Sequence, residues 1–257
     1  MKINYAFTSH TGERESNQDE TGARVGEHSA CFLVCDGVGG TAGGDRAARI
    51  ARDVLLARLD DRSFTACDSK AWVEQAELAI REAQRKNLNF ERMSTTLAAL
   101  FIDRDRQLAW WAHAGDSRIY HFRRGFIHNV TRDHSLAQQL KDAGVDNTGI
   151  NSNLLYNALG ADGSQSVSYS EVMPLEDGDA FLVCTDGFWC NLQSGEMEQA
   201  LRMVSSPQEW LALMHKAIGR NENKDNLSAV AVWVGSPQDT TLLQSMADSV
   251  RFLPSRD

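Results

Sequence analysis

Aspartate adjoins three apolar segments of the chain that are too short to be ordinary helices. The segments and their aspartates are Ser29–Cys35 with Asp36, Ala180–Cys184 with Asp186, and Leu227–Val234 with Asp225. A short, continuous apolar run is typical of a strand that is covered on both faces. A carboxylate at the end of such a strand is costly to bury without a partner. Because no matching set of three arginines stands beside these aspartates, the pattern indicates a site for cations.

The residue types in this pattern favour one kind of cation. Clustered carboxylates suit hard cations, so Mg²⁺ or Mn²⁺ is expected rather than zinc. The five cysteines agree with this choice, because none of them forms a CxxC pair. Their odd number favours free thiols in a reducing compartment, and we expect Cys35 and Cys184 to be buried structural thiols.

The charge balance and the hydropathy exclude other classes of protein. The 257 residues include 35 Asp or Glu and 26 Lys or Arg, giving a formal net charge of −9, whereas a nucleic-acid binder usually presents a basic face. No window approaches the roughly 20 apolar residues of a membrane span, and Met1–His10 lacks the apolar core of a signal peptide. We therefore expect a cytoplasmic protein that binds neither nucleic acid nor membrane.

The remaining elements are read from periodicity. Ile3–Phe7 alternates like a strand with one buried face, and apolar residues recur at helical spacing from Asp45 to Leu55 and from Lys70 to Lys86. Further strands are expected at Thr96–Ile102, Leu108–Ala114, Ser117–Phe122, Phe126–Val130 and Val167–Val172, and further helices at Ser135–Ala143, Glu196–Val204 and Gln208–Ile218.

This order of elements lacks the regular alternation of a doubly wound parallel sheet. It predicts an α+β protein, a four-layer αββα sandwich of two antiparallel sheets flanked by helices. One domain is the simplest expectation, because the chain has no internal repeat, Pro-rich linker or low-complexity segment. The residues expected in the middle layer are Phe32, Leu33, Val34, Phe181, Leu182 and Val183.

The sharpest local motif is Asp36-Gly-Val-Gly-Gly40. Its glycines permit a tight turn and leave the carbonyl of Gly37 free to face a cation beside the carboxylate. A simple turn at the end of a strand would explain the same residues without any ligand. A nucleotide-binding loop is disfavoured, because no Lys-Ser/Thr follows and the GxGxxG spacing is absent.

Eight motifs, taken together and in order, resemble one family. They are Arg14-Glu-Ser-Asn-Gln-Asp19, Asp36-Gly-Val-Gly-Gly40, Ser94-Thr-Thr96, Gly115-Asp-Ser-Arg118, Asp133-His-Ser135, Leu159-Gly160, Thr185-Asp-Gly187 and Asp225-Asn226. Over roughly residues 5 to 234 the chain resembles the metal-dependent Ser/Thr protein phosphatases of the 2C type (PPM), in their stand-alone bacterial form. The resemblance implies hydrolysis of phosphoserine and phosphothreonine in proteins by a hydroxide that bridges two metal ions, Mn²⁺ or Mg²⁺, with a third ion in some members.

The resemblance also implies a role for each matching residue. Asp36 would bridge two metals, and the Gly37 carbonyl would bind one of them. The other implied roles are Asp186 and Asp225 on the first metal, Asp19 on the second metal through water, Asp116 with Asp186 on a third metal, and Arg14 on the substrate phosphate. The planar, bidentate guanidinium of Arg14 suits a phosphate.

The chain departs from the family pattern at four positions. Gln18 stands where many relatives have Glu, so a direct carboxylate contact from this position to the second metal is lost. Val38 replaces a histidine that is proposed as general acid in eukaryotic members, and His134 is not a safe substitute. Ser94 replaces a glycine and Asn157 an arginine, and neither is given a role.

The resemblance implies a catalytic domain over residues 1–235, with a flap at about 136–165 centred on Gly144–Asn153, and a C-terminal tail over 236–257. Phosphorylated proteins would be the substrates, a bacterial Ser/Thr kinase would be opposed, and a monomer is expected. Elsewhere, His113 is expected to be a buried core histidine. Arg118, Arg123 and Arg124 are expected on a solvated strand face, near enough to the motifs to meet a phosphopeptide.

Two other functions remain in view. A catalytically inactive phosphatase-fold module would bind regulatory partners only, but such a module is expected to have lost Asp36, Asp186 or Asp225, and all three are present. A metal-dependent nuclease also uses clustered aspartates, but the acidic balance and the missing basic groove argue against it.

Overall fold

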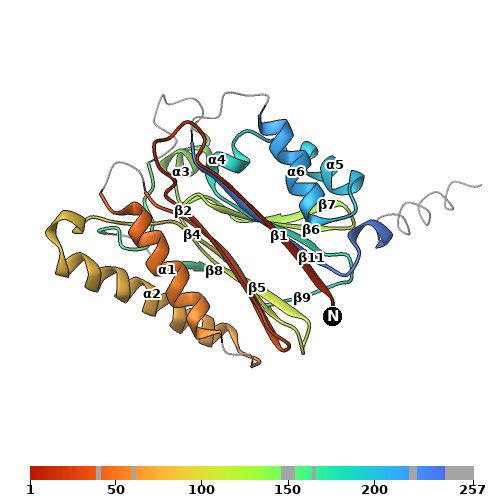
Figure 1. Cartoon of the computed structure of the whole chain (residues 1–257), viewed down its shortest axis with the longest axis horizontal. Coiled ribbons are helices and arrows are strands. Elements are labelled where there is room, and N and C mark those ends of the chain that lie inside the picture. The colour runs from red at the N-terminus through yellow and green to blue at the C-terminus, as the bar shows by residue number, and fades with distance from the viewer. Residues whose placement is uncertain (39–41, 60–61, 146–153, 164–165, 220–224, 241–257) are drawn as a thin grey trace, which may run out of the picture.

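Two antiparallel sheets stack face to face, and helices cover the outer face of each (Figure 1). The computed structural model describes the chain except for residues 39–41, 60–61, 146–153, 164–165, 220–224 and 241–257. This arrangement confirms the predicted α+β, four-layer αββα sandwich.

The two sheets are each built from strands that are distant in sequence. Sheet A has five strands, in the spatial order β1 (Ile3–His10), β11 (Leu227–Val234), β10 (Ala180–Cys184), β6 (Arg118–Arg123) and β7 (Phe126–Val130). Sheet B has six strands, β2 (Asp19–Val25), β3 (Ser29–Asp36), β4 (Leu97–Asp103), β5 (Leu108–Ala114) and β8 (Ser168–Tyr169), with β9 (Met173–Pro174) also paired to β5. All of these pairings are antiparallel.

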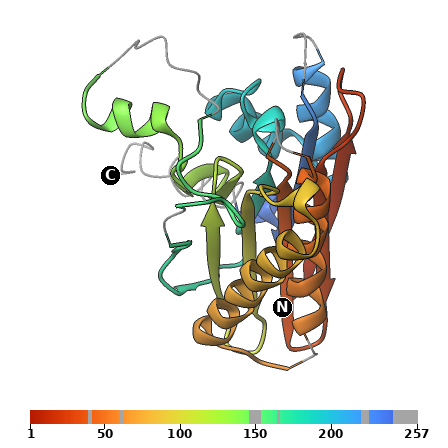
Figure 2. The ribbon, with the colours of Figure 1, turned by 90° about the vertical axis from the view of Figure 1, so that its left-hand side faces the viewer.

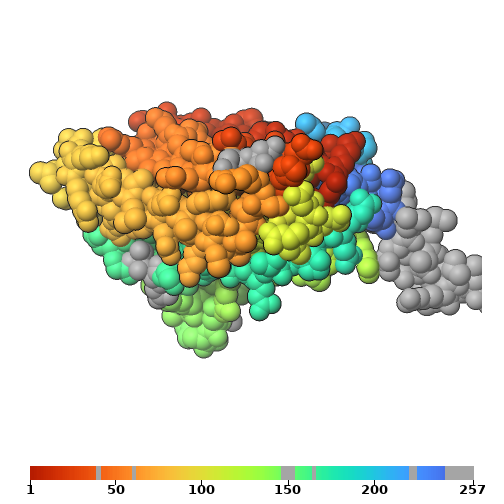
Figure 3. Space-filling model, turned by 90° about the horizontal axis from the view of Figure 1, so that it is seen from below, coloured from red at the N-terminus to blue at the C-terminus, as the bar shows by residue number. Residues whose placement is uncertain are grey.

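Helices α1 (Gly44–Arg58) and α2 (Ala66–Lys86) pack on sheet B, and a single 3₁₀ turn, η1 (Leu88–Phe90), follows α2. Helices α4 (Asp186–Trp189), α5 (Ser194–Met203) and α6 (Pro207–Ile218) lie on the side of sheet A. Helix α3 (Leu136–Asp142) stands away from both sheets in Figure 2 and projects from the body of the molecule in Figure 3. α2 begins at a capping box, in which Thr65 and Asp68 satisfy each other's backbone amides.

Alternation along the central strands divides the interior into three apolar layers. Phe32 and Val34 of β3 face Phe181 and Val183 of β10 between the sheets. Leu33 packs instead against α1 and α2, and Leu182 packs against α5 and α6. All six residues of the two apolar runs were predicted to lie in the middle layer. This was wrong for Leu33 and Leu182, because neighbouring side chains of a strand point to opposite faces.

Four elements differ from the sequence expectations. The polar segment Asp19–Val25 was not expected to be a strand but forms β2 at the edge of sheet B. The strand expected at Val167–Val172 is reduced to the two residues of β8, and the two residues of β9 follow beyond it. The turn after Thr185 closes into α4, a helix of one turn.

Part of the predicted flap, including most of Gly144–Asn153, and most of the predicted tail lie outside the described residues. None of the helices that the structure describes combines the length and the apolar character needed to cross a membrane.

Candidate metal centre

A cavity of about 590 Å³ lies where chain segments from both sheets meet. Six of the seven predicted site residues line it, and the seventh, Asp19, is buried close by. The six are Arg14, Asp36, Gly37, Asp116, Asp186 and Asp225. The structure therefore brings together residues that are far apart in the sequence, from Arg14 to Asp225.

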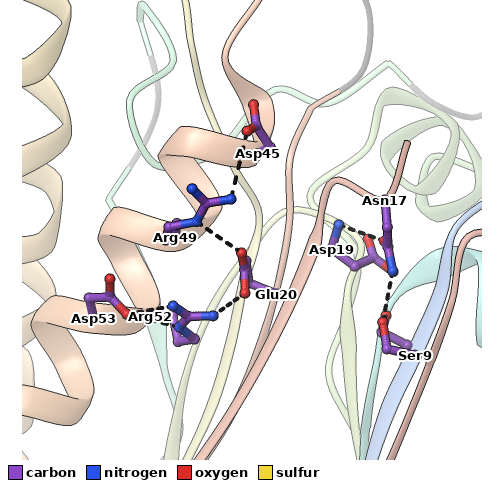
Figure 4. Close-up of polar contacts among 9 residues, drawn as sticks. Ser9, Asn17, Asp19, Glu20, Asp45, Arg49, Arg52 and Asp53 are labelled. Carbon is purple, nitrogen blue, oxygen red and sulfur yellow. Dashed lines mark hydrogen bonds and ion pairs between the residues drawn. The ribbon is translucent and has the colours of Figure 1, made fainter. Parts of the chain in front are cut away.

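Strand register places two of the carboxylates opposite each other. Asp19 on β2 pairs with Asp36 on β3 in the antiparallel ladder, so both side chains lie on the same face of sheet B. Glu20, the next residue, points to the other face and forms ion pairs with Arg49 and Arg52 of α1 (Figure 4). These pairs fasten α1 to β2 beside the cavity, and the fixed register aims Asp19 toward the interior.

Asp36 is held by the segment that precedes β4. Its backbone amide donates to Thr96 Oγ1 at 2.9 Å, and its carbonyl accepts from the Thr96 amide at 2.8 Å and from Thr95 Oγ1 at 2.9 Å. Thr95 in turn exchanges two backbone hydrogen bonds with Leu159. The Ser94-Thr-Thr96 and Leu159-Gly160 motifs therefore support the aspartate from behind.

Backbone contact explains the glycine after Asp36. A Cβ atom on Gly37 would lie 2.4 Å from the carbonyl carbon of Gly44, at the start of α1, a distance that real Cβ atoms do not tolerate. The Gly37 amide donates to the Gln18 carbonyl at 3.1 Å. The missing side chain thus lets Gly37, which lines the cavity, lie against the start of α1.

The same contact recurs at the second Asp-Gly pair. A Cβ atom on Gly187 would lie 2.0 Å from the Asn226 carbonyl oxygen, so the absence of a side chain lets the backbones that carry Asp186 and Asp225 approach each other. Asp225 Oδ2 pairs with Arg14 at 3.0 Å. The Arg14 side chain is 54% exposed, which leaves its guanidinium open to the cavity.

Asn226 ties the N-terminal motif to this pair of aspartates. Its Oδ1 accepts from the Gln18 amide at 2.8 Å, and its Nδ2 donates to the carbonyls of Thr11 at 2.7 Å and Ser16 at 3.0 Å. These bonds fix the loop that carries Arg14. In the motif Asp225-Asn226, the carboxylate lines the cavity and the amide that follows it holds the loop of Arg14.

Asp19 combines deep burial with an unmet acceptor. Thr185 Oγ1 donates to Asp19 Oδ2 at 3.0 Å, while Asp19 Oδ1 is buried without a hydrogen-bond partner among the described residues. Burial, followed by the charges of Asp186 and Asp225, raises the pKa of Asp19 to about 7. An orphaned carboxylate oxygen of this kind is suited to a cation or to a water that a cation holds.

The other carboxylates also repel one another. Burial and the charge of Asp19 raise the pKa of Asp36 well above its ordinary value, and burial and Asp186 raise the pKa of Asp116 to about 8. Burial and Asp225 raise the pKa of Asp186 as well. A divalent cation among these groups would remove this repulsion, so the residues present fit Mg²⁺ or Mn²⁺.

The carboxylates alone do not make a closed coordination shell. Within the described ranges, no three His, Cys, Asp or Glu side chains form a group that could hold a metal ion by themselves. The Gly37 carbonyl and water would therefore supply the remaining ligands. Mg²⁺ commonly keeps several waters in such sites.

Asp116 lies beside a cluster that the sequence did not reveal. Its carbonyl accepts from Trp189 Nε1 at 2.9 Å, and the guanidinium of Arg118 lies 3.3 Å from the centre of the Trp189 ring. Arg118 also donates to both oxygens of Asp133, at 2.7 and 2.8 Å. A second cavity of about 360 Å³ is lined by Asp133 together with Asp116 and Asp186.

The prediction that Arg118, Arg123 and Arg124 form a solvated strand face was wrong for two of the three. The Arg118 side chain is only 22% exposed, because it is held by Asp133 and Trp189. Arg123 donates to both oxygens of the fully buried Asp179, at 2.8 Å each. Asp133 and Arg118 belong to motifs that the sequence displays, but their pairing depends on how β6 meets the following loop.

His113 is buried, as predicted, and burial lowers its pKa to about 3. The described lining of the 590 Å³ cavity contains neither His113 nor His134.

Known proteins resemble this chain in sequence and in fold. A family model described as "Protein phosphatase 2C" matches residues 8–230. The "Serine/threonine phosphatase stp" of Listeria monocytogenes is 26% identical over 233 residues, covering 85% of this chain and 90% of the relative.

Among solved structures, the serine/threonine phosphatase PstP/Ppp of Mycobacterium tuberculosis is 25% identical with a TM-score of 0.79, covering 91% of this chain and 99% of that one. A structure of the catalytic domain of PstP in complex with two manganese ions is 26% identical with a TM-score of 0.78, covering 91% and 98%.

Proposed function

The chain belongs to the protein phosphatase 2C family, and from this premise we propose that it hydrolyses phosphoserine and phosphothreonine in proteins with Mn²⁺ or Mg²⁺ as cofactor. The observation that carries the proposal is the meeting of carboxylates from both sheets in one cavity, beside an exposed arginine. Burial and mutual repulsion raise the pKa values of Asp19, Asp36 and Asp116, and either protons or divalent cations would relieve that repulsion.

In this proposal each carboxylate has a defined place. Asp36 would hold two cations, with the Gly37 carbonyl on one of them. Asp186 and Asp225 would complete the first site, Asp19 would serve the second through water, and Asp116 with Asp186 would serve a weaker third. Divalent cations bound there would lower the pKa of water enough to supply hydroxide near neutral pH, and would offset the charge of the phosphoryl group.

Arg14 binds the substrate phosphate. Its guanidinium already meets one carboxylate oxygen of Asp225 at 3.0 Å, and its remaining donors are available for phosphate oxygens in the bidentate geometry that arginine favours. Asn226 holds the loop that carries Arg14 through the carbonyls of Thr11 and Ser16.

Two departures from the family pattern have physical consequences. The Gln18 backbone donates to Asn226 and accepts from Gly37. These two hydrogen bonds do not depend on whether the side chain is Glu or Gln. Val38 offers no proton to the leaving group, and no histidine lines the described part of the cavity. We assign the proton for the departing serine or threonine oxygen to water or to another group in the cavity.

We further propose, from family likeness alone, that the substrates are products of a Ser/Thr kinase and that the chain acts as a cytoplasmic monomer. Residues 1–235 would form the catalytic domain, with a flap at about 136–165 and a tail at 236–257.

The experiment that tests the function is hydrolysis of para-nitrophenyl phosphate and of a phosphothreonine peptide, with Mn²⁺ and with EDTA. Phosphate release from both substrates is expected only with Mn²⁺. A pure, folded protein that releases no phosphate with Mn²⁺ would favour the inactive binding module. Release from a phosphotyrosine peptide in preference to the phosphothreonine peptide would contradict the proposed substrate class.

A further inference from the structure

His134 connects three segments of the chain through its ring. Its Nδ1 lies 3.3 Å from the Gly115 amide nitrogen and 3.0 Å from Asn157 Nδ2, and its Nε2 lies 2.9 Å from Ser168 Oγ. The residue is buried. Both ring nitrogens are therefore engaged, one with the turn between β5 and β6 and with Asn157, the other with β8.

The partners of Nδ1 define the form of the ring. A backbone N–H and an amide NH₂ can only donate, so Nδ1 accepts from Gly115 and from Asn157. The proton of the neutral ring is then on Nε2, which donates to Ser168. An imidazolium would direct an N–H at two donors, and burial also lowers the pKa of His134.

The Gly115 end of this connection leads directly to the cavity. Gly115 precedes Asp116, and it has a φ of +99°, a left-handed conformation that glycine adopts without strain. Its backbone is confined on the other side by Thr96, whose side chain would lie 2.6 Å from a Cβ atom at this position. The Thr96 hydroxyl is 2.6 Å from that of Ser117. The turn that carries Asp116 is thus held between Thr96 and His134.

The Asn157 end leads to other residues that line the same cavity. Asn157 is buried, and it also donates to the Ser166 carbonyl at 3.2 Å. Leu154 and Leu155, just before it, line the cavity. Asn157 stands where the family has an arginine. Its shorter, uncharged amide donates to Nδ1 of the neutral His134 ring.

We propose that His134 is a positioning residue, whose Nδ1, shared between Gly115 and Asn157, fixes the turn that presents Asp116 to the metal centre. This inference rests on the proposed function for its metal, but it concerns contacts of this chain alone. His134 does not line the cavity of the aspartates, and its Nε2 proton is committed to Ser168. The ring therefore orients a neighbour and does not exchange protons with the substrate.

Two substitutions separate the two ends of the ring. His134→Asn keeps an acceptor near the position of Nδ1 and removes the Nε2 contact, whereas His134→Gln reaches toward Ser168 and removes the Nδ1 acceptor. Ser168→Ala is the matched control for the Nε2 contact. Asp116→Ala identifies which Mn²⁺ binding step depends on Asp116. Mn²⁺ binding is measured by titration calorimetry on the full chain, with melting temperatures recorded to show that each variant is folded.

His134→Gln is expected to raise the Mn²⁺ dissociation constant of the Asp116-dependent step by about tenfold, as loss of an outer hydrogen-bond partner commonly does. His134→Asn and Ser168→Ala are expected to stay within about twofold of the parent, because the acceptor for Gly115 is retained. A merely structural histidine would lower the melting temperature in both His134 variants without separating their isotherms.

Equal Mn²⁺ isotherms for His134→Asn and His134→Gln would overturn the proposal, as would a parent isotherm that Asp116→Ala leaves unchanged. The readout is independent of catalysis. Failure of the proposed function would appear as absent phosphatase activity with the expected isotherms, and failure of this inference as phosphatase activity without the difference between the variants.

Discussion

Each of the two Asp-Gly pairs at the cavity has its glycine where another backbone passes. Gly37 abuts Gly44, and Gly187 abuts Asn226, at distances that exclude a Cβ atom. From the sequence, the glycine after Asp36 was interpreted as a means of turning and of exposing a carbonyl. The structure adds a stronger reason, because the missing side chain determines how closely α1 and the Asp225 loop approach the carboxylates.

Gly37→Ala is expected to lower the free energy of unfolding by about 1–3 kcal/mol, as overpacking does, since Gly44 is backbone and cannot rotate away. Urea unfolding measures the change. Gly195→Ala is the matched control: Gly195 is in α5 with nothing within 4 Å of an added Cβ atom, and alanine favours the helix there. A Gly37→Ala protein as stable as the Gly195→Ala protein would contradict the close contact.

The site residues that could be predicted are those that a local sequence pattern marks. Asp36, Asp186 and Asp225 could be selected because each adjoins an apolar run, and Arg14, Asp19 and Asp116 because each belongs to a motif that resembles a family pattern. The pairing of Arg118 with Asp133 under Trp189 could not be selected, since it depends on three segments meeting in space. The role of His134 depends likewise on the ring's partners.

At the scale of elements, helix α2 supports the metal centre from the far side of sheet B. One face of the helix contacts Gly160 and Ala161, which lie within the range of the predicted flap, and also Met93. The contacts are Glu77 with the Gly160 amide at 2.6 Å, Arg81 with the Ala161 carbonyl at 2.6 Å, and Gln84 with the carbonyls of Gly160 and Met93 at 2.8 Å each. Because Leu159 pairs with Thr95, and Thr95 bonds the Asp36 carbonyl, this face is connected to the central carboxylate.

Replacing Gln84 with Met keeps the volume and removes both donors, so two buried carbonyls lose a partner. The free energy of unfolding is expected to fall by about 2 kcal/mol, within the range for unsatisfied buried groups. Glu82→Met, on the exposed face of the same helix, is expected to change it by less than about 0.5 kcal/mol. Urea denaturation of both variants checks this, and equal midpoints would show that the helix face does not hold the loop.

Strand bounds were predicted correctly for three buried apolar runs and also for the exposed strand β7, Phe126–Val130. The strands at Leu108–Ala114, Ala180–Cys184 and Leu227–Val234 have the predicted bounds, because their continuous apolar runs are buried on both faces. β2 was missed because an edge strand with Glu20 and Arg24 on it carries no such run. The pairs β8 and β9 are two residues each, too short for any periodicity to appear.

At the scale of the whole molecule, the fold brings several carboxylates of like charge close together. Sheet B supplies Asp19 and Asp36, and segments at the ends of sheet A supply Asp186 and Asp225. Stacking the sheets over an apolar middle layer forces these carboxylates into one cavity. Apolar burial therefore maintains an arrangement that electrostatic repulsion alone would disperse.

A pH dependence follows from this arrangement in the metal-free protein. Asp19 and Asp116 have pKa values of about 7 and about 8 in the fold, against an ordinary value of 3.8. Between pH 4 and 8 the folded state thus holds protons that the unfolded chain has released, so stability falls as the pH rises. The metal-free melting temperature is expected to be higher at pH 5 than at pH 8.

Mn²⁺ replaces those protons, so the stabilisation that it gives is expected to be larger at pH 8 than at pH 5. Asp116→Asn removes one of the raised groups and should flatten the metal-free pH profile in its upper part. Thermal scans across this range provide the measurement. A parental melting temperature that rises from pH 5 to pH 8 without metal would show that the carboxylates do not repel one another as described.

The central claim is that carboxylates from both sheets form a single metal centre for phosphate hydrolysis. It is tested most directly by kcat for a phosphothreonine peptide at saturating Mn²⁺ in Asp36→Asn, at the end of β3 in sheet B, and in Asp186→Asn, in α4 just after β10 of sheet A. Both variants are expected to lose more than about a hundredfold in kcat while remaining folded, because each removes an oxygen anion from the shared centre. Parental kcat in either variant would contradict the claim.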